Sequence, residues 1–533
     1  MKKLLAVLLA LAMVLAMAGC SGSGSSAAPA PASSGETPAS SETPAAEVDA
    51  NINVMLTTSP VGLHPLKTND SPSTYVNGQM FQTLYRRTID GTDYKPLLAA
   101  ELPEFSEDGL TATIKLREGV TFHDGTPFTS AAVGYMIDCL KDPDYGSQRP
   151  SIVESIESYE CPDDNTIVLH LAYADGVLVA KLAHTNGCIV NPELDKTQDL
   201  MVNPAGAGTG PYKFVSAVAG SNYKLEANED YWEGAPEVKT VNVDVVPDET
   251  TAIARLKTGE GDFIPTLLAD SFDEANAIEG YTAVSTPSSA IFYLAYRSSD
   301  TAKNDIMADP EFRKMLIEAV DLEYYTENMM GIHATHVKSI VGPTLVGYTP
   351  AMDEAYIAPN LENAKATVEA NGWNGTEITM LVSTREWHQT VAAYVQGELA
   401  KAGIKVNVIS EEWGTFLDDM KKDDYYDFGI LSWSNVTGDG QQMLEPNFST
   451  KNGVRLKYNN AEFDAEVEAS ARTTVLEERQ EHMLNAVKMI QGDAIVTPLY
   501  SDNARYCYNS AKFGNVNLDK GGQFYLNDFT LVK

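Results

Sequence analysis

The sequence lacks the local patterns that identify many enzymes and nucleotide-binding proteins. It has no Gly-x-x-x-x-Gly-Lys-Ser/Thr phosphate loop, no His-Glu-x-x-His helix and no Gly-x-Ser-x-Gly elbow. Basic residues are also few, because 38 lysines and arginines stand against 74 aspartates and glutamates, a formal charge of −36. A chain this acidic is a poor partner for nucleic acid or for an anionic membrane surface. Missing motifs do not exclude catalysis, because triads and carboxylate pairs need not be local in sequence.

Cysteine is scarce, with five in 533 residues, and no two are spaced as Cys-x-x-Cys. This spacing argues against a zinc ribbon and against a thioredoxin-like redox site. The four cysteines of the body can form disulfides or remain buried free thiols, and the sequence leaves both states open. They are Cys139, Cys161, Cys188 and Cys507.

The only long hydrophobic run lies at the amino terminus. Residues 4–17 are uncharged and follow two lysines, a run too short for a membrane span of ~20 residues but suited to a secretory signal. Met17-Ala18-Gly19-Cys20 resembles a bacterial lipobox, in which Cys20 would carry the lipid. We therefore expect a signal peptide at residues 1–19 and, at residues 20–50, the lipidated cysteine with a disordered tether rich in Ser, Ala and Pro. The protein would be anchored to the outer face of the cell membrane through lipid alone.

The body alternates short apolar strands with amphipathic helices, which predicts an α/β fold of about 480 residues in two or three lobes. For example, Val238–Val246 alternates with a period of two, and Asp248 can cap a following helix that ends at Gly259. Other strands are expected at Ile52–Leu56, Ala112–Leu116, Glu377–Val382, Ile404–Ile409, Asp427–Leu431 and Val496–Tyr500. Other helices are expected at Glu362–Ala370, Val391–Ala402 and Glu477–Ile490.

Two segments imitate functional motifs. Residues 206–210, Gly-Ala-Gly-Thr-Gly, look like a dinucleotide loop, but a strand from Pro211 to Val215 is expected next, where that loop needs a helix. His333 and His336 are a weak candidate for metal contact, because no third ligand is evident nearby. A solvated loop is the alternative, and we expect neither a metal nor another cofactor.

A series of landmarks in fixed order resembles the family 5 solute-binding proteins of peptide and nickel ABC importers. The landmarks cover nearly all of residues 51–533. They are the stretches 122–131 (FHDGTPFTSA), 208–212 (GTGPY), 225–236 (LEANEDYWEGAP), 412–413 (EW), 428–433 (FGILSW), 458–464 (YNNAEFD) and 498–500 (PLY). In the first of these, Asp124-Gly125 would form a turn, and Thr129 or Ser130 would cap the next helix.

The resemblance implies a two-lobed clamp of the periplasmic-binding-protein type II class, with an extra domain in the first lobe. Lobe 1 would comprise residues 51–300 and 491–533, with the extra domain at about 92–210, and lobe 2 would comprise residues 301–490. The ligand would lie in the cleft and be enclosed by hinge closure.

The resemblance also implies ligand-binding residues. Trp433 and the segment Thr437-Gly438-Asp439 match the place where peptide-binding members keep an aspartate for the ligand's amino terminus, so Asp439 is the candidate for that role. Trp433 would form an apolar wall or belong to the core. Arg385 lies near an arginine that dipeptide-binding relatives use for a carboxylate, and Arg149 lies near one that nickel-binding relatives use for a metal chelate. Capping of a turn by Asp439 and surface pairing of Arg385 are the structural alternatives.

We therefore expect a monomeric extracytoplasmic lipoprotein that binds a short peptide, delivers it to the permease subunits of an ABC importer and performs no catalysis. A nickel or metallophore complex is the alternative ligand. A secreted hydrolase with dispersed catalytic residues and a receptor that signals without import are the alternatives in other functional classes.

Overall fold

Most strands of the body belong to one mixed sheet. The structure, a computed structural model, describes residues 50–298 and 301–532. The predicted signal peptide, Cys20 and the predicted tether up to residue 49 lie outside the described residues. The sheet strands are β1 Asn51–Leu56, β8 Tyr212–Val218, β9 Asn222–Ala227, β10 Thr240–Val245, β11 Phe263–Ile264, β12 Tyr281–Tyr296, β13 Ala334–His336, β14 Glu377–Ser383, β15 Lys405–Glu411, β16 Phe428–Trp433 and β17 Val496–Asn509. Their order is β15-β14-β16-β12-β17-β11-β1-β10-β9-β8, and β13 also pairs with β17.

The helices surround this sheet and fill both lobes. They are α1 Ser71–Met80, α2 Ser130–Lys141, α3 Leu178–Leu182, α4 Pro192–Thr197, α5 Glu249–Thr258, α6 Phe272–Asn276, α7 Pro310–Glu318, α8 Leu322–Tyr324, α9 Leu361–Asn371, α10 Glu386–Lys401, α11 Trp413–Asp419, α12 Gln441–Phe448, α13 Ala461–Arg472 and α14 Leu476–Gly492. Among the described residues, no helix is both long enough and apolar enough to cross a membrane.

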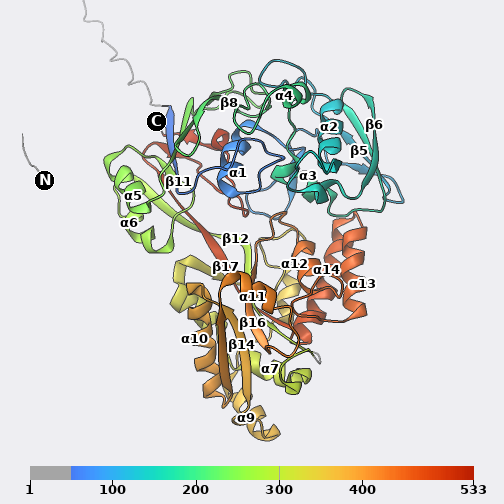
Figure 1. The fold of residues 1–533 in the computed structure, drawn as a ribbon, viewed down its shortest axis with the longest axis vertical. Helices are drawn as coiled ribbons and strands as arrows, with labels where there is room; N and C mark the ends of the chain where they lie inside the picture. The colour runs from blue at the N-terminus through green and yellow to red at the C-terminus, as the bar shows by residue number, and fades with distance from the viewer. Residues whose placement is uncertain (1–49, 299–300, 533) are drawn as a thin grey trace, which may run out of the picture. The chain divides into compact units, whose positions relative to one another are not determined.

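Two long strands carry the chain between the two halves of the sheet. β12 and β17 pair antiparallel, and their register shifts between Pro287 and Ile291. On one side lie β11, β1, β10, β9 and β8, which belong to the half that we call lobe 1 (residues 50–287 and 502–532). On the other side lie β16, β14 and β15, which belong to lobe 2 (the described residues between 291 and 501). Figure 1 shows β12 and β17 passing from one half to the other.

Lobe 1 carries a second, smaller sheet. Its strands are β4 Glu104–Phe105, β5 Thr111–Lys115, β6 Ile156–Asp163 and β7 Thr166–Leu171, in the order β4-β5-β7-β6. Apolar residues of β5 and β7, including Ile114 and Ile167, belong to the same buried cluster as Val133 and Ile137 of α2. Burial of each such side chain contributes ~1.5–3 kcal/mol. This sheet with α2 forms a layer of its own beside the main sheet (Figure 1).

The local signals at helix ends are mostly confirmed. Asp248 caps α5 by accepting a hydrogen bond from the backbone N–H of Thr251 at 2.8 Å, and Gly259 ends the helix with φ +75°. At α2, Thr129 occupies the cap position but makes no side-chain cap bond. The Ser130 hydroxyl instead donates to the carbonyl of Asp163 at 2.6 Å, because the helix starts against the small sheet.

The glycine-rich segment serves close packing and precedes a strand. A Cβ on Gly208 would lie 2.0 Å from the carbonyl oxygen of Met80, and one on Gly210 would lie 2.7 Å from it. Only glycine allows the backbone to approach the end of α1 so closely. The expected strand follows directly as β8, so no helix amino terminus faces this loop.

Two predicted elements of lobe 2 had wrong boundaries. α10 begins at Glu386, whereas the apolar pattern predicted Val391, because its first turn, Glu386-Trp387-His388-Gln389, is mostly polar in sequence although His388 is buried. β17 continues nine residues beyond the predicted end at Tyr500. The extension begins with Ser501-Asp502-Asn503, which has no apolar alternation because here the strand leaves the core of lobe 2 and passes the space between the lobes.

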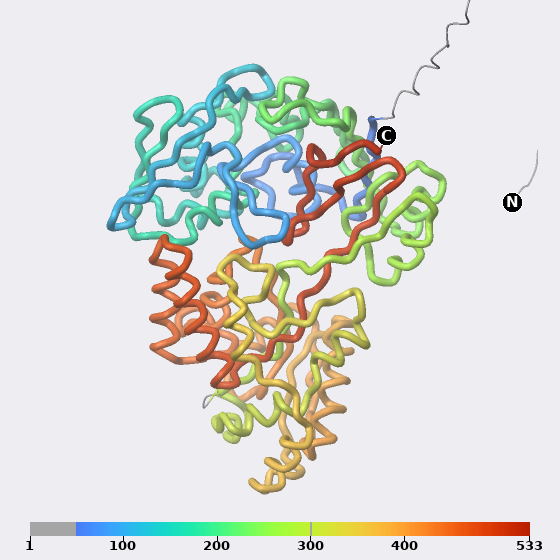
Figure 2. The backbone as a smooth tube through the Cα atoms, turned by 180° about the vertical axis from the view of Figure 1, so that it is seen from behind, coloured from blue at the N-terminus to red at the C-terminus, as the bar shows by residue number. Residues whose placement is uncertain are grey.

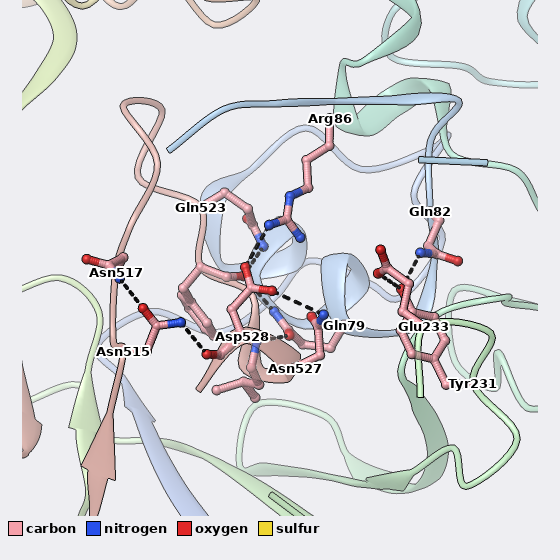
Figure 3. A network of polar contacts seen from close by, with 12 residues as sticks. Gln79, Gln82, Arg86, Tyr231, Glu233, Asn515, Asn517, Gln523, Asn527 and Asp528 are labelled. Atoms are coloured by element: carbon pink, nitrogen blue, oxygen red, sulfur yellow. Dashed lines mark hydrogen bonds and ion pairs between the residues drawn. The ribbon is translucent and has the colours of Figure 1, made fainter. Parts of the chain in front are cut away.

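The carboxyl-terminal segment returns to lobe 1 (Figure 2), where a polar network holds it on α1 (Figure 3). Gln79 of α1 donates to the carbonyl of Phe524 and accepts from the backbone N–H of Leu526, both at 3.0 Å. Arg86 forms an ion pair with Asp528 at 2.6 Å (Figure 3). These contacts join residues more than 440 positions apart, so lobe 1 is complete only with both ends of the body.

The four cysteines of the body are free thiols. Cys139, Cys188 and Cys507 are buried, and Cys161 is exposed.

Candidate ligand site between the lobes

A cavity of about 480 Å³ lies where the two crossing strands pass between the lobes. We call it the main cavity. Its walls come from the start of α1, residues 265–267, both crossings at residues 288–290 and 502–505, lobe 2 at residues 434–437, and the carboxyl-terminal segment at residues 518–525. Elements from both lobes thus enclose one space, as a clamp requires.

A second cavity of about 250 Å³ adjoins it, and we call it the side cavity. Both cavities are lined by His184, Val436 and Thr437. Four of the residues predicted to bind ligand line the side cavity: Arg149, Trp433, Thr437 and Asp439. The structure therefore brings together residues that are almost 300 positions apart in the sequence.

The carboxylate of Asp439 is engaged by a partner from α14. Both of its oxygens accept hydrogen bonds from Nη2 of Arg479, at 2.8 and 2.9 Å, and Oδ1 also accepts from the backbone N–H of Gln441 at 2.9 Å. Asp439 is 1% exposed and Arg479 is 5% exposed. Burial alone would lower the pKa of Arg479, but the adjacent Asp439 carboxylate outweighs it and raises that pKa. Asp439 remains only a predicted ligand contact.

The neighbours of Asp439 join the two lobes. The hydroxyl of Tyr94, in the lobe 1 strand β3 (Tyr94–Pro96), donates to the carbonyl of Thr437 at 2.7 Å. Gly438 has φ +79°, and a Cβ there would lie 2.3 Å from Cζ of Arg87 in lobe 1. The turn at residues 437–438 therefore needs a glycine both for its backbone conformation and for the close approach of Arg87.

Arg149 and Trp433 take different positions in the side cavity. Nε of Arg149 donates to Oδ1 of Asn69 at 3.3 Å. Trp433 is half-buried at the end of β16 and packs against the buried core of lobe 2. Trp433 thus belongs to the edge of the lobe 2 core and also lines the side cavity, and its role as an apolar wall for a ligand stays a prediction.

The other predicted contacts lie outside both cavities. Arg385 is exposed and stacks over the ring of Trp413, with Cζ 3.5 Å from the ring centroid. His333 contacts the ring of Phe272, and His336 contacts the ring of Tyr356. Within residues 50–298 and 301–532, no group of three or more His, Cys, Asp or Glu side chains is placed to hold a metal ion.

Arg87 is a site residue that the sequence did not reveal. It follows Arg86 at the end of β2 (Tyr85–Arg87), lines the main cavity and is 7% exposed. Its Nη2 donates to the carbonyl oxygens of Thr344, across the lobes, and of Gly91. Its Nε and Nη1 are buried without a hydrogen-bond partner.

Charged groups of both signs share the main cavity with Arg87. Burial raises the pKa of Asp519, whose Oδ1 accepts from the backbone N–H groups of Gly521 at 2.8 Å and Gln523 at 3.0 Å. Burial, with the Arg87 charge adding to it, lowers the pKa of Lys520. Asp502 and Arg505 form an ion pair at 3.2 Å on the crossing strand β17.

The sequence of α14 contains one indication of a buried ion pair that the sequence-based predictions did not include. Arg479 precedes Met483 by four residues and so lies on the buried stripe of the helix. A cation on such a face needs a buried counter-ion. The pattern alone could not identify Asp439 as that partner, because the two residues lie 40 positions apart.

Comparison with known proteins decides the family. The model of the family "Bacterial extracellular solute-binding proteins, family 5 Middle" matches residues 93–454, more than half of the chain. The chain belongs to family 5 of the bacterial extracellular solute-binding proteins. This family 5 protein is therefore a two-lobed binding protein, as its landmarks predicted.

Its curated relatives are distant but are matched over most of their length. The oligopeptide-binding protein AppA of Bacillus subtilis is 26% identical, over 76% of this chain and 77% of the relative. A glutathione-binding protein GsiB of Pectobacterium atrosepticum is 27% identical, over 87% of this chain and 90% of the relative. Among solved structures, HbpA2 from Haemophilus parasuis has a TM-score of 0.82 at 22% identity and covers 91% of this chain and 100% of its own. These structures place the family 5 protein in the clamp fold.

Proposed function

We propose that this family 5 protein captures a short peptide between its lobes and delivers it unchanged to the permease subunits of an ABC importer. The main cavity carries this proposal. Its volume of about 480 Å³ falls within the ~300–1,000 Å³ of typical small-ligand sites, and both lobes contribute to its walls. The relatives AppA and GsiB, named for oligopeptide and glutathione binding, support a peptide as the ligand.

The composition of the cavity walls suits a peptide backbone. The crossing strands line the cavity at residues 288–290 and 502–505, and a turn containing two glycines lines it at residues 518–522. Peptide-binding proteins of broad specificity hold an extended ligand chiefly through its backbone and leave tolerant pockets for its side chains. No step of this function requires catalysis.

A nickel or metallophore complex is the alternative ligand. A nickel ABC transporter structure from Bacillus halodurans has a TM-score of 0.76, and Arg149 lines the side cavity as a chelate-binding arginine would. Because the described residues hold no cluster of metal ligands, the chelator would have to supply the metal's coordination itself.

The proposal includes location. The lipobox-like sequence ending at Cys20 and the apolar run before it support a lipoprotein on the outer face of the cell membrane. We propose that it acts there as a monomer.

A direct test is native mass spectrometry of the purified body, residues 48–533, mixed with randomised di-, tri- and tetrapeptides. Retention of a peptide, with masses that identify its length, is the expected result. Retention of Ni²⁺ with a chelator but of no peptide would favour the alternative. Conversion of the peptides into new masses would refute a binding-only function.

A further inference from the structure

The two lobes also touch through residues that line neither cavity. The loop at residues 173–176 of lobe 1, between β7 and α3, meets the corner between α13 and α14 of lobe 2. We call this meeting point the distal contact, because Figures 1 and 2 both show α13 and α14 below the layer of the small sheet, to one side of β12 and β17. The backbone N–H of Gly176 donates to the carbonyl of Ala471 at 2.8 Å. Cζ of Arg472 lies 3.7 Å from the centroid of the Tyr173 ring.

Gly176 permits this close approach. A Cβ at Gly176 would lie 2.0 Å from the carbonyl oxygen of Thr473 and 3.0 Å from Nε of Arg479, both in lobe 2. The φ of Gly176 lies outside the left-handed region, so it does not itself demand a glycine. The missing side chain therefore serves the contact between the lobes.

Buried charges reinforce the distal contact. Asp175 of lobe 1 is 1% exposed and pairs with Lys181 at 2.8 Å. Arg479, beside Gly176, belongs to lobe 2 and pairs with Asp439. Burial lowers the pKa of Arg479, but Asp439, with Asp175 adding to it, raises that pKa overall. Separation of the lobes would therefore weaken an attraction between Asp175 and Arg479.

We propose that the distal contact holds the two lobes together through contacts of the chain itself and so sets how long a bound ligand is retained. Its hydrogen bond and its ring contact join only residues of this chain, so they act in the same way for every ligand that the main cavity accepts. The contact forms only when the lobes meet, so its loss should speed ligand release more than it slows capture. The holding of the lobes is independent of the proposed function, whereas the effect on retention rests on it.

The first test measures the separation of the lobes without any ligand. The body, residues 48–533, is one compact unit and does not contain Cys20. Nitroxide labels on Cys161, the exposed thiol of β6, and on Glu481→Cys, at an exposed position of α14, report this separation by pulsed electron paramagnetic resonance. We expect Gly176→Ala to lengthen the distance between the labels, because the new methyl group occupies the position of lobe 2 atoms.

The matched control is Gly397→Ala on α10. No atom lies within 4 Å of the Cβ position of Gly397, and its φ also lies outside the left-handed region. This variant should keep the wild-type label distance. An unchanged distance in Gly176→Ala would overturn the inference and leave the proposed function standing.

The second test measures capture and release of a randomised tripeptide mixture by stopped-flow tryptophan fluorescence. Loss of one backbone hydrogen bond corresponds to roughly a 2- to 13-fold change, so with the added clash we expect Gly176→Ala to raise the mean dissociation rate at least about fivefold. The association rate should change less than the dissociation rate. Tyr173→Leu, which removes the ring below Arg472, should raise the dissociation rate by a smaller factor, and Tyr173→Phe, which keeps the ring, should not.

The two measurements separate the claims. A longer label distance in Gly176→Ala with an unchanged dissociation rate would refute the role in retention. If the wild-type protein bound no tripeptide, the proposed function would be refuted, and the label distances alone would decide whether the distal contact holds the lobes together. If Gly176→Ala does not fold, Tyr173→Leu and Tyr173→Phe decide by the same two measurements, and equal behaviour of these two variants would overturn the inference.

Discussion

Substitution of Gly438 by alanine should have two separate effects: loss of a contact between the lobes, which lowers ligand affinity, and backbone strain, which lowers the free energy of unfolding. The new methyl group would lie 2.3 Å from Cζ and 2.4 Å from Nε of Arg87, so the guanidinium must move away. Movement breaks the charge-assisted hydrogen bond from Arg87 to the carbonyl of Thr344. Hydrogen bonds to charged groups contribute about 1.5–3 kcal/mol, which corresponds to roughly a 10- to 150-fold change in an equilibrium.

The positive φ of Gly438 adds a separate cost of about 1 kcal/mol for any residue with a Cβ. This strain is present with and without ligand, so it lowers the free energy of unfolding but cancels in the affinity. The bond from Arg87 to Thr344, in contrast, joins the two lobes, so its loss would disfavour the closed arrangement that encloses a ligand. We therefore expect Gly438→Ala to weaken binding of randomised tripeptides by up to about 10- to 150-fold, as measured by native mass spectrometry.

Gly372→Ala is the matched control. Gly372 also has a positive φ, of +69°, but no atom lies within 4 Å of its Cβ position. It should lose about 1 kcal/mol in the free energy of unfolding and keep its affinity. Equal affinities of Gly438→Ala and of the wild-type protein would refute the reasoning that the contact of Arg87 with Thr344, which needs a glycine at position 438, contributes to ligand binding.

Three further predictions concern the buried pair, pH and the anchor. Arg479→Met should lower the free energy of unfolding by about 3–5 kcal/mol in urea titrations, because it leaves the Asp439 carboxylate buried alone, and adding Asp439→Asn should restore part of the loss. Burial lowers the pKa of His388 to about 3, and its Nδ1 accepts from the backbone N–H of Ser383. The stability from this neutral imidazole is therefore complete above pH 6.5 and is lost as the pH falls towards 3, by up to about 1.4 kcal/mol per pH unit. His388→Gln should flatten that loss in urea titrations at pH 7 and 4.5, and an unchanged slope would contradict the assignment. Cys20→Ala should move the protein from the membrane fraction to the soluble fraction of cells, whereas continued membrane retention would exclude the lipid anchor.

The regular elements were predictable because each depends on neighbouring residues. The alternation in Val238–Val246 gave β10, and Asp248 with Gly259 gave both ends of α5. Prediction failed where tertiary surroundings replace local pattern. The polar start of β17's extension has no strand signal of its own, and it is extended because β12 pairs with it along the crossing.

The candidate site was only partly predictable for the same reason. The family landmarks identified Trp433, Thr437 and Asp439, which share one cavity with Arg149. They did not identify Arg87 or Arg479, since the role of each depends on a partner distant in the chain. Whether a charged side chain is buried and paired can be determined only when the residues around it in the fold are known.

The paired crossings have a consequence for dividing the protein. β12 and β17 form one continuous antiparallel ladder through both lobes, and the register shift between Pro287 and Ile291 marks the point where the ladder passes from one lobe to the other. Cutting the chain there would leave long strands with unmet backbone groups in each fragment. Such open edges promote aggregation. We therefore do not expect either lobe to fold alone. An engineered sensor based on this protein should keep the whole body and carry one fluorescent label on each lobe.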